Sequence, residues 1–350
     1  MAPANVLITG GSGYIGGTLL WHLTQHKEPS IPTSSTLYSL VRSEDQANQT
    51  KTVYGIEPLA LDLSSEEDIS LALEKHSIHI VVFLIDSRSS NVALRFIKAL
   101  EKLQRRTGVQ THFVYASGAK GFSSHVDFPL EPPVSDEDER MYAIQKGQES
   151  CTKKGRVIPT ANNAIIEAAE AHGVRAYVVV PCIVYGEGEG FGKKVSIQTV
   201  AVVKAARAKR KMYSVTPGRA IWPVCHIRDQ ASMLACLLKN ILTGAKVGHN
   251  RNGYFLASPG SVAWDDIYAA MGAALLRHGI VDDDKVIEAD QEALQLMAKA
   301  LECTPDTVSL EMGGTCTWIP KHAKSIGWVP TYKPKHILEA ANAEVDLILQ

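Results

Sequence analysis

Three glycines near the start of the chain have the spacing of a phosphate-binding turn. Residues 9–16 read T-G-G-S-G-Y-I-G and directly follow the apolar run Val6-Leu7-Ile8. In such a turn Gly10 permits the tight bend, Gly13 lets the backbone approach a pyrophosphate, and Gly16 lets the next helix pack closely on the strand. Free N–H groups at the helix start favour phosphate. Between a strand and a helix, the spacing predicts a dinucleotide site rather than a turn that binds nothing.

The end of the second predicted strand bears on which dinucleotide is bound. Residues 36–41 (T-L-Y-S-L-V) read as a strand, Arg42-Ser43 follow it, and the first acid is Glu44. NAD sites usually carry Asp or Glu at this strand end, whereas arginine accommodates the 2′-phosphate of NADP. Arg42 offers a planar fork of donors for phosphate. We therefore predict NADP(H); NAD(H), with Arg42 simply solvated, is the alternative.

Strand-like and helix-like segments alternate through the first half of the chain. The run I-V-V-F-L-I at 80–85 is continuously apolar, as in a strand buried on both faces. The predicted strands are 6–9, 36–41, part of 53–61, 80–85, 112–116 and 176–180, and the predicted helices are 12–25, 64–75, 91–106 and 165–171. This alternation predicts an α/β fold, a Rossmann-type doubly wound parallel sheet covered by helices on both sides.

The last hundred residues change character and predict a smaller, mostly helical lobe. Helix-like segments lie around 264–276, 291–301 and 336–349. We expect residues 1–185 to form the NADP-binding domain, with 220–258 returning to it. Residues 186–219 and 259–350 would form the lobe that binds the substrate. The loop 118–140 is long and rich in proline and acid, as functional loops often are.

Composition excludes several classes of protein. The 350 residues are 45% apolar and 21% charged, with a formal net charge of −1. This balance argues against a nucleic-acid partner, and the short basic cluster 207–211 suits a helix end. No apolar run is long enough to cross a membrane, and the first residues leave no room for a signal segment. Six cysteines without a C-x-x-C pair, and histidines 76 and 79 without spaced partners, indicate a cytoplasmic protein with neither disulfides nor a metal site.

The motifs together resemble those of the extended short-chain dehydrogenase/reductases, which include sugar-nucleotide epimerases, dehydratases and carbonyl reductases. The chain looks most like an atypical, fungal-type member, and the resemblance covers nearly its whole length. It implies that the cofactor contacts Gly10, Gly13, Tyr14, Ile15, Gly16, Arg42, the adenine-binding pair Asp62-Leu63, and Pro181 in P-C-I-V-Y-G beside the nicotinamide. Residues 222–229 (W-P-V-C-H-I-R-D) and 326–330 (I-G-W-V-P) resemble a strand that closes over the substrate and a recurring C-terminal element.

The resemblance also implies a catalytic set. The family uses Ser or Thr after the fifth strand and a Tyr-x-x-x-Lys pair on the next helix. Ser117 would hold the substrate oxygen, Tyr142 would move its proton, and Lys146, one helical turn away, would lower the tyrosine pKa and hold the ribose. A second register, counted back from residues 167 and 181, puts the pair near Pro159 and Asn163, and there it is absent.

Two further residues are candidates for proton transfer. Some relatives that reduce conjugated alkenes carry a functional lysine at the position of Lys120, in S-G-A-K-G-F, where it could stabilise negative charge on a carbonyl oxygen. The alternative is that Lys120 has no catalytic function and is a solvent-exposed lysine in a loop. His226 could face the substrate as a general acid, or could be a hydrogen-bonded structural histidine.

Taken together, these patterns predict an enzyme that transfers hydride between the nicotinamide and a carbonyl or conjugated enone of a small metabolite. An epimerase, dehydratase or isomerase without net redox change is a second possibility. A nucleotide-binding regulator without catalysis belongs to a different class and stays open. A homodimer is possible.

Overall fold

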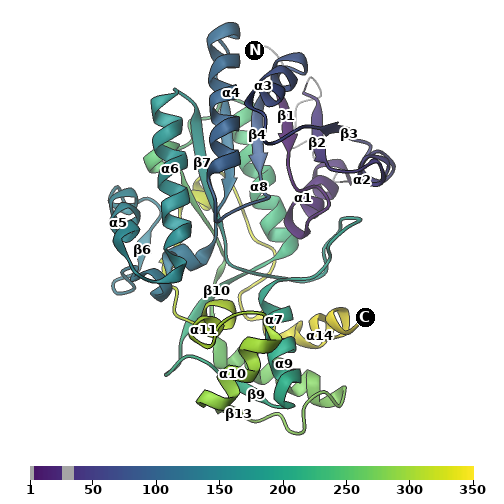
Figure 1. The fold of residues 1–350 in the computed structure, drawn as a ribbon, viewed down its shortest axis with the longest axis vertical. Coiled ribbons are helices and arrows are strands. Elements are labelled where there is room, and N and C mark those ends of the chain that lie inside the picture. Colours follow the sequence, from purple (N-terminus) through teal and green to yellow (C-terminus); the bar gives the residue numbers. More distant parts are fainter. Residues whose placement is uncertain (1–3, 26–34) are drawn as a thin grey trace.

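The structure, a computed structural model, describes residues 4–25 and 35–350. Residues 1–3, part of the opening stretch in which no signal segment is expected, lie outside this range. In the described part, a seven-stranded sheet occupies the centre of the larger region (Figure 1). Its strands are β1 (Asn5–Ile8), β2 (Leu37–Val41), β3 (Glu57–Ala60), β4 (Ile78–Phe83), β5 (His112–Ala116), β7 (Arg175–Pro181) and β11 (Tyr254–Ala257).

The sheet is parallel throughout, in the order β11-β7-β5-β4-β1-β2-β3. All six residues of β4 are buried, which explains its unbroken apolar run. On one side α3 (Glu66–Lys75) packs against α4 (Asn91–Thr107), which contacts α6 (Val157–Ala171); α1 (Tyr14–Gln25) packs against α8 (Ile227–Leu242). Figure 1 shows α4 and α6 in front of the sheet and α8 behind it. The predicted doubly wound α/β fold is confirmed.

The strand order reverses at β1, and this reversal marks the place where a ligand can bind. From β1 the chain proceeds through β2 and β3 on one side, then returns to β4 on the other. The loops after β1 and β4 therefore diverge from neighbouring strands and leave a crevice at their carboxyl ends. The glycine-rich turn follows β1 and is one wall of this crevice.

The smaller region, in the lower half of Figure 1, is mostly helical, as predicted. It contains α7 (Gln198–Lys209), α9 (Trp264–Arg277), α10 (Gln291–Ala300), α11 (Val308–Met312), α13 (His336–Glu339), α14 (Ala341–Leu349) and the strand pair β9 (Met212–Ser214) with β13 (Val286–Glu288). The basic cluster 207–211 does lie at a helix end, because α7 ends at Lys209 and Arg210 is its C-cap residue. The helix expected at 336–349 is divided at Ala340 into α13 and α14.

Several short elements connect the two regions. A three-stranded sheet joins β8 (Ile183–Tyr185), β10 (Ile221–His226) and β12 (Gly260–Ala263). The loop 118–140 contains the 3-10 turns η2 (Ala119–Phe122) and η3 (Ser124–Val126), and its strand β6 (Val134–Ser135) pairs with β14 (Trp318–Ile319). Tyr142 and Lys146 lie on one helix, α5 (Met141–Gly147), as the motif implied. Sequence patterns did not predict α2 (Glu44–Gln49), the π-helix η1 (Thr50–Tyr54), the turns η4 (Gln148–Ser150), η5 (Lys154–Arg156), η6 (Asn250–Asn252) and η7 (Pro305–Thr307), or α12 (His322–Ser325). None of the described helices is long and apolar enough to cross a membrane.

Candidate functional site

The turn between β1 and α1 is tight enough to require glycine. Gly10 has a left-handed backbone, with φ of 73°, and its carbonyl accepts a hydrogen bond of 2.8 Å from the Gly13 amide. A Cβ at Gly16 would lie 2.2 Å from the Gly10 oxygen, so no other residue fits there without a backbone shift. The first N–H groups of α1, from Tyr14 onward, point out of a helix start and suit a pyrophosphate. The turn is thus a cradle that fits a dinucleotide.

The end of β2 lies next to this turn, and β3 is the next strand along the sheet. Arg42 is exposed directly after β2, and its amide donates to Gln46 Oε1 at 2.9 Å. Gln46 in turn donates to the Ser12 hydroxyl at 3.2 Å, which links the end of β2 to the glycine-rich turn. Asp62 is exposed after β3; hydrogen bonds from the hydroxyl and amide of Ser64 lower the pKa of its carboxyl, and Leu63 follows it.

A cavity of about 320 Å³ opens at the carboxyl ends of β1, β4, β5 and β7. Most of its wall is apolar, with few polar groups, which is the usual character of a small-molecule site. Its lining residues are Tyr14, Ile15, Leu84–Arg88, Ala116–Lys120, Ile158, Pro181, Cys182, Val184, Ser196–Gln198 and Trp222. The structure therefore brings Tyr14, Ile15, Ser117 and Pro181 together, and adds Lys120.

Ser117 is buried in this cavity wall and its hydroxyl is oriented by a polar chain. Its Oγ donates to Asn162 Oδ1 at 2.7 Å, and Asn162 Nδ2 donates to Gln145 Oε1 at 2.8 Å. Gln145 donates to the Gly121 carbonyl at 2.6 Å, which returns the chain to the loop after β5. Sequence reasoning missed Asn162; two adjacent asparagines in the otherwise apolar stretch 161–166 were the available signal.

Lys120 is a buried cation rather than a solvated loop lysine. Its side chain is 14% exposed, and Nζ lies 3.1 Å from Oε2 of Glu311, which belongs to α11 in the helical lobe. Burial lowers the pKa of the Lys120 ammonium, and the charge and hydrogen bond of Glu311 partly oppose this effect. The pair joins the loop after β5 to the lobe across the cavity.

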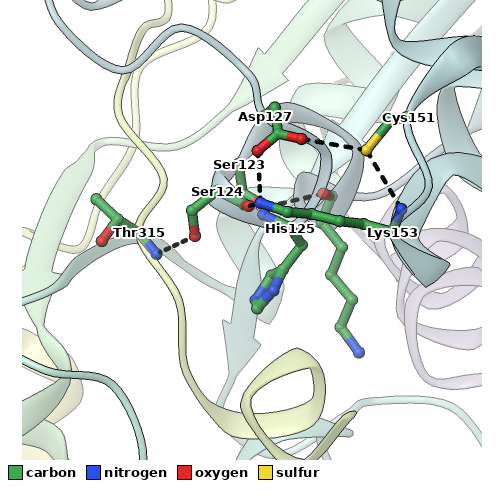
Figure 2. A network of polar contacts seen from close by, with 8 residues as sticks. Ser123, Ser124, His125, Asp127, Cys151, Lys153 and Thr315 are labelled. Atoms are coloured by element: carbon green, nitrogen blue, oxygen red, sulfur yellow. Dashed lines mark hydrogen bonds and ion pairs between the residues drawn. The ribbon is translucent and has the colours of Figure 1, made fainter. Parts of the chain in front are cut away.

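A second polar network holds the turn that carries Lys120 (Figure 2). The Ser123 hydroxyl donates to the Lys120 carbonyl at 2.8 Å. Ser124 and Thr315 exchange two hydrogen bonds, from the Ser124 amide to the Thr315 carbonyl and from the Thr315 amide to the Ser124 hydroxyl. Lys153 Nζ donates to the Ser124 carbonyl at 2.8 Å. The backbone of η2 and η3 is thereby clamped on both sides, so the position of Lys120 is set by tertiary contacts.

Tyr142 and Lys146, the expected catalytic pair, do not line the cavity. Both lie on the short helix α5, where the Tyr142 hydroxyl donates to Glu167 at 2.7 Å and its ring lies under Arg251, 4.6 Å from the guanidinium carbon. Lys146 pairs with Glu167 at 2.7 Å, which raises the pKa of the lysine. The helix ends at Gly147 and two turns precede α6, so the pair lies outside α6.

The structure also locates His226 and the residues of the second Tyr-Lys register, near Pro159 and Asn163. Ile158 of α6 reaches the cavity, whereas Asn163 is buried and donates to Glu149 at 2.8 Å. His226 ends β10, and its ring stacks on Tyr332 with 3.8 Å between ring centroids, away from the cavity lining. Burial lowers the pKa of His226 to about 4, and its Nδ1 accepts a hydrogen bond from the Arg228 amide at the start of α8.

The segment 186–199 closes one side of the cavity and is held at both ends. The carboxylate of Glu344, from α14, accepts hydrogen bonds from the Gly186 amide at 2.8 Å and the Thr199 hydroxyl at 2.7 Å. Between these points the Lys193 amide donates to the Ser12 carbonyl at 3.0 Å, so the segment packs on the glycine-rich turn. Burial raises the pKa of Glu344. The glycine- and lysine-rich stretch 187–194 is therefore packed against the glycine-rich turn in this structure.

Comparisons with known proteins agree with this fold and crevice. Residues 6–249 match the model of the NAD dependent epimerase/dehydratase family. The chain therefore belongs to that family of nicotinamide-dinucleotide enzymes. No curated protein sequence matches it significantly.

Solved structures share the fold over nearly the full length. UDP-glucose 4-epimerase from Thermotoga maritima is 13% identical, with 99% of this chain and 100% of that chain covered and a TM-score of 0.60. The dTDP-glucose 4,6-dehydratase from Bacillus anthracis is 12% identical over 98% and 97%, with a TM-score of 0.63. Vestitone reductase from alfalfa is 15% identical over 98% of both chains, with a TM-score of 0.59. These neighbours include both redox enzymes and epimerases.

The contact between Gly16 and Gly10 gives a first prediction. Gly16→Ala should destabilise the chain by about 1–3 kcal/mol, because the backbone must shift to admit the methyl group, and should weaken dinucleotide binding. Gly147→Ala is the matched control, since Gly147 has helical dihedrals and open space around its Cβ position. Thermal unfolding and dinucleotide titration measure both effects. Unchanged stability and affinity in Gly16→Ala would contradict the packing argument.

Proposed function

We propose that this chain is an NADP(H)-dependent oxidoreductase that reduces a carbonyl or conjugated enone of a small metabolite, or catalyses the reverse reaction. The observation that carries the proposal is the cavity at the carboxyl ends of β4, β5 and β7, where the Ser117 hydroxyl and the buried Lys120 ammonium share one wall. Its largely apolar lining and modest volume suit a small carbonyl compound better than a sugar nucleotide.

Residues of this chain suit each part of the cofactor. Gly10, Gly13, Tyr14, Ile15 and Gly16 would hold the pyrophosphate at the start of α1. Arg42 would meet the 2′-phosphate, Asp62 and Leu63 the adenine, and Pro181 the nicotinamide. When bound, the dinucleotide supplies or accepts the hydride; the protein supplies orientation and electrostatics.

Ser117 and Lys120 would act on the substrate oxygen. Both groups line the cavity, so a carbonyl oxygen placed there would receive a hydrogen bond from the Lys120 ammonium. It would receive a second one from the Ser117 hydroxyl once that group turns its single hydrogen from Asn162 to the substrate. As the oxygen gains negative charge, the ammonium stabilises it and then gives up a proton. Because burial lowers the pKa of Lys120, this proton is released more readily than from a lysine in water. Lys120 would thus take the part that the sequence pattern predicted for Tyr142.

Purified protein assayed with NADPH and a panel of aromatic ketones and conjugated enones tests the function. The proposed function is supported if the absorbance of the reduced nicotinamide falls while the alcohol or the saturated ketone forms. Conversion of a substrate without net NADPH consumption would indicate isomerisation and reject net redox chemistry. Nucleotide binding without turnover across the panel would favour a regulator instead.

Substitutions of Lys120 and of Tyr142 are expected to have opposite effects on activity. Lys120→Met keeps the side-chain volume but removes the ammonium, and should lower kcat/KM by about 10²–10³-fold with unchanged dinucleotide affinity. Tyr142→Phe should retain activity, because its hydroxyl bonds Glu167 rather than a cavity group. Steady-state kinetics and nucleotide titration compare the two variants. Loss of activity in Tyr142→Phe, with Lys120→Met active, would reverse the assignment.

Glu311 should affect how activity depends on pH. The carboxylate keeps the Lys120 pKa higher than burial alone would allow, and activity that needs the ammonium falls as pH rises through that pKa. In Glu311→Gln the pKa of Lys120 falls further, so the alkaline limb of the kcat/KM profile should move to lower pH. Glu302→Gln, an exposed neighbour at the cavity mouth, is the control. If the alkaline limb of the kcat/KM profile lies at the same pH in Glu311→Gln as in the unmodified protein, Lys120 is not the acid.

Arg42 distinguishes the two dinucleotides. Arg42→Ala should weaken NADP(H) binding by about tenfold or more, since a charged hydrogen bond to phosphate is lost, and should leave NAD(H) binding nearly unchanged. Calorimetric titration with each nucleotide measures the two constants. An equal loss for both nucleotides would show that Arg42 does not contact a 2′-phosphate.

A further inference from the structure

Arg88 lies where three cavities meet. It follows β4, in the loop before α4, and its side chain is exposed. The residue lines the 320 Å³ cavity that holds Ser117 and Lys120. It also lines two neighbouring cavities of about 530 Å³ each, one beside η5 and α6 and the other facing α11 of the helical lobe. Arg88 is therefore a lining residue common to all three cavities.

The guanidinium of Arg88 has no ion-pair partner within residues 4–25 and 35–350. The carboxylate nearest in sequence, Asp86, accepts backbone N–H bonds from Arg88 at 2.8 Å and Ser89 at 3.2 Å, which forms a turn and not a salt bridge. At the same opening Lys154 is neutralised, because its Nζ lies 3.1 Å from Asp306. Arg88 thus presents its donors to the opening without a protein acceptor.

Arg88 is the cation that all three cavity linings share. The inner cavity is lined by Arg88 and Lys120 against one acid, Asp86. The cavity beside α6 is lined by two arginines, 88 and 156, against one glutamate, 149. The cavity facing α11 is lined by residues 88, 120 and 154 against two acids, 302 and 311. Taken together, the three linings hold four cations (residues 88, 120, 154 and 156) and four acids (residues 86, 149, 302 and 311). Lys120 and Lys154 are paired with carboxylates, whereas Arg88, which belongs to all three linings, has no such partner in the part of the chain that the structure describes.

The inner cavity constrains the remainder of the ligand. Beyond Ser117 and Lys120 its walls are mainly hydrophobic, including Ile158, Val184 and Trp222. A ligand that fits must carry an apolar body inside, an oxygen at the Ser117–Lys120 wall, and a negative group at the mouth. Guanidinium binds a carboxylate through two parallel hydrogen bonds, which gives geometric selection as well as attraction.

We propose that Arg88 is a specificity-determining residue that binds a carboxylate of the substrate, so that the substrate is a carbonyl or enone compound bearing a carboxylic acid. This inference rests on the proposed oxidoreductase function. The inner cavity then receives the reacting carbonyl and the apolar body, while the carboxylate stays at the mouth beside Arg88.

Matched acid and ester probes test the proposal in the full chain loaded with NADP⁺. Phenylglyoxylate and 4-oxo-4-phenylbutanoate are compared with their methyl esters by calorimetric titration. At least one acid should bind about tenfold more tightly than its ester. Arg88→Gln should abolish that preference without changing ester affinity, and Arg88→Lys should restore only part of it. Arg156→Gln, an exposed arginine that lines only the cavity beside α6 among those described, should keep the preference.

Several outcomes would overturn the carboxylate site. The first is that neither acid binds more tightly than its ester, or that neither acid binds at all. The second is that Arg88→Gln weakens the binding of acid and ester equally. The third is that UDP, and not the acids, binds in a way that depends on Arg88. Unchanged thermal unfolding of Arg88→Gln shows that the fold is intact. The reductase assay is read separately with NADPH. If the acids bind in an Arg88-dependent way but NADPH is not oxidised, the carboxylate site stands and the proposed redox function is rejected. If ester and acid both oxidise NADPH with equal kcat/KM, the redox function stands and the carboxylate site is rejected.

Discussion

The end of β1 and the start of α1 approach so closely that no side chain fits between them. The missing Cβ of Gly16 leaves space for the Gly10 carbonyl, and the left-handed Gly10 turns the chain from strand to helix. A Cβ at Gly10 would contact Ile85 at 3.3 Å, so the loops after β1 and β4 still touch at the base of the crevice that opens between them. Because β1 lies at the reversal of the strand order, this contact brings together the loops that form the cavity.

The buried pair Lys120–Glu311 connects this edge of the sheet to the helical lobe. A buried cation is stable only with a partner, and here the partner comes from another region of the fold. The contact between the loop and the lobe therefore also raises the proton affinity of Lys120, against the larger effect of burial. In the same cavity the Ser117 hydroxyl is oriented by buried amides, so both candidate groups depend on residues far away in sequence.

Tyr142 and Lys146 show how a correct local spacing can mislead. The pair has the separation of a family motif and does lie on one helix, but that helix is α5, which ends before α6 begins. Glu167 and Glu149 neutralise Lys146, and Glu167 accepts from Tyr142, so these polar groups are satisfied outside the cavity. Local spacing specifies which side chains share a helix face; it carries no information about which neighbour that face meets.

The sequence by itself determined the alternation of strands and helices, the parallel sheet, the glycine-rich turn and the helical character of the last hundred residues. These features depend on local patterns: buried apolar runs, helical periodicity, and glycines where a Cβ cannot fit. Only the tertiary structure decided that Lys120 and Arg88, and not Tyr142, line the cavity with Ser117, and that Glu311 pairs with Lys120 while Asn162 accepts from Ser117. Burial, pairing and proton affinity arise between segments up to 191 residues apart, and no local pattern records them.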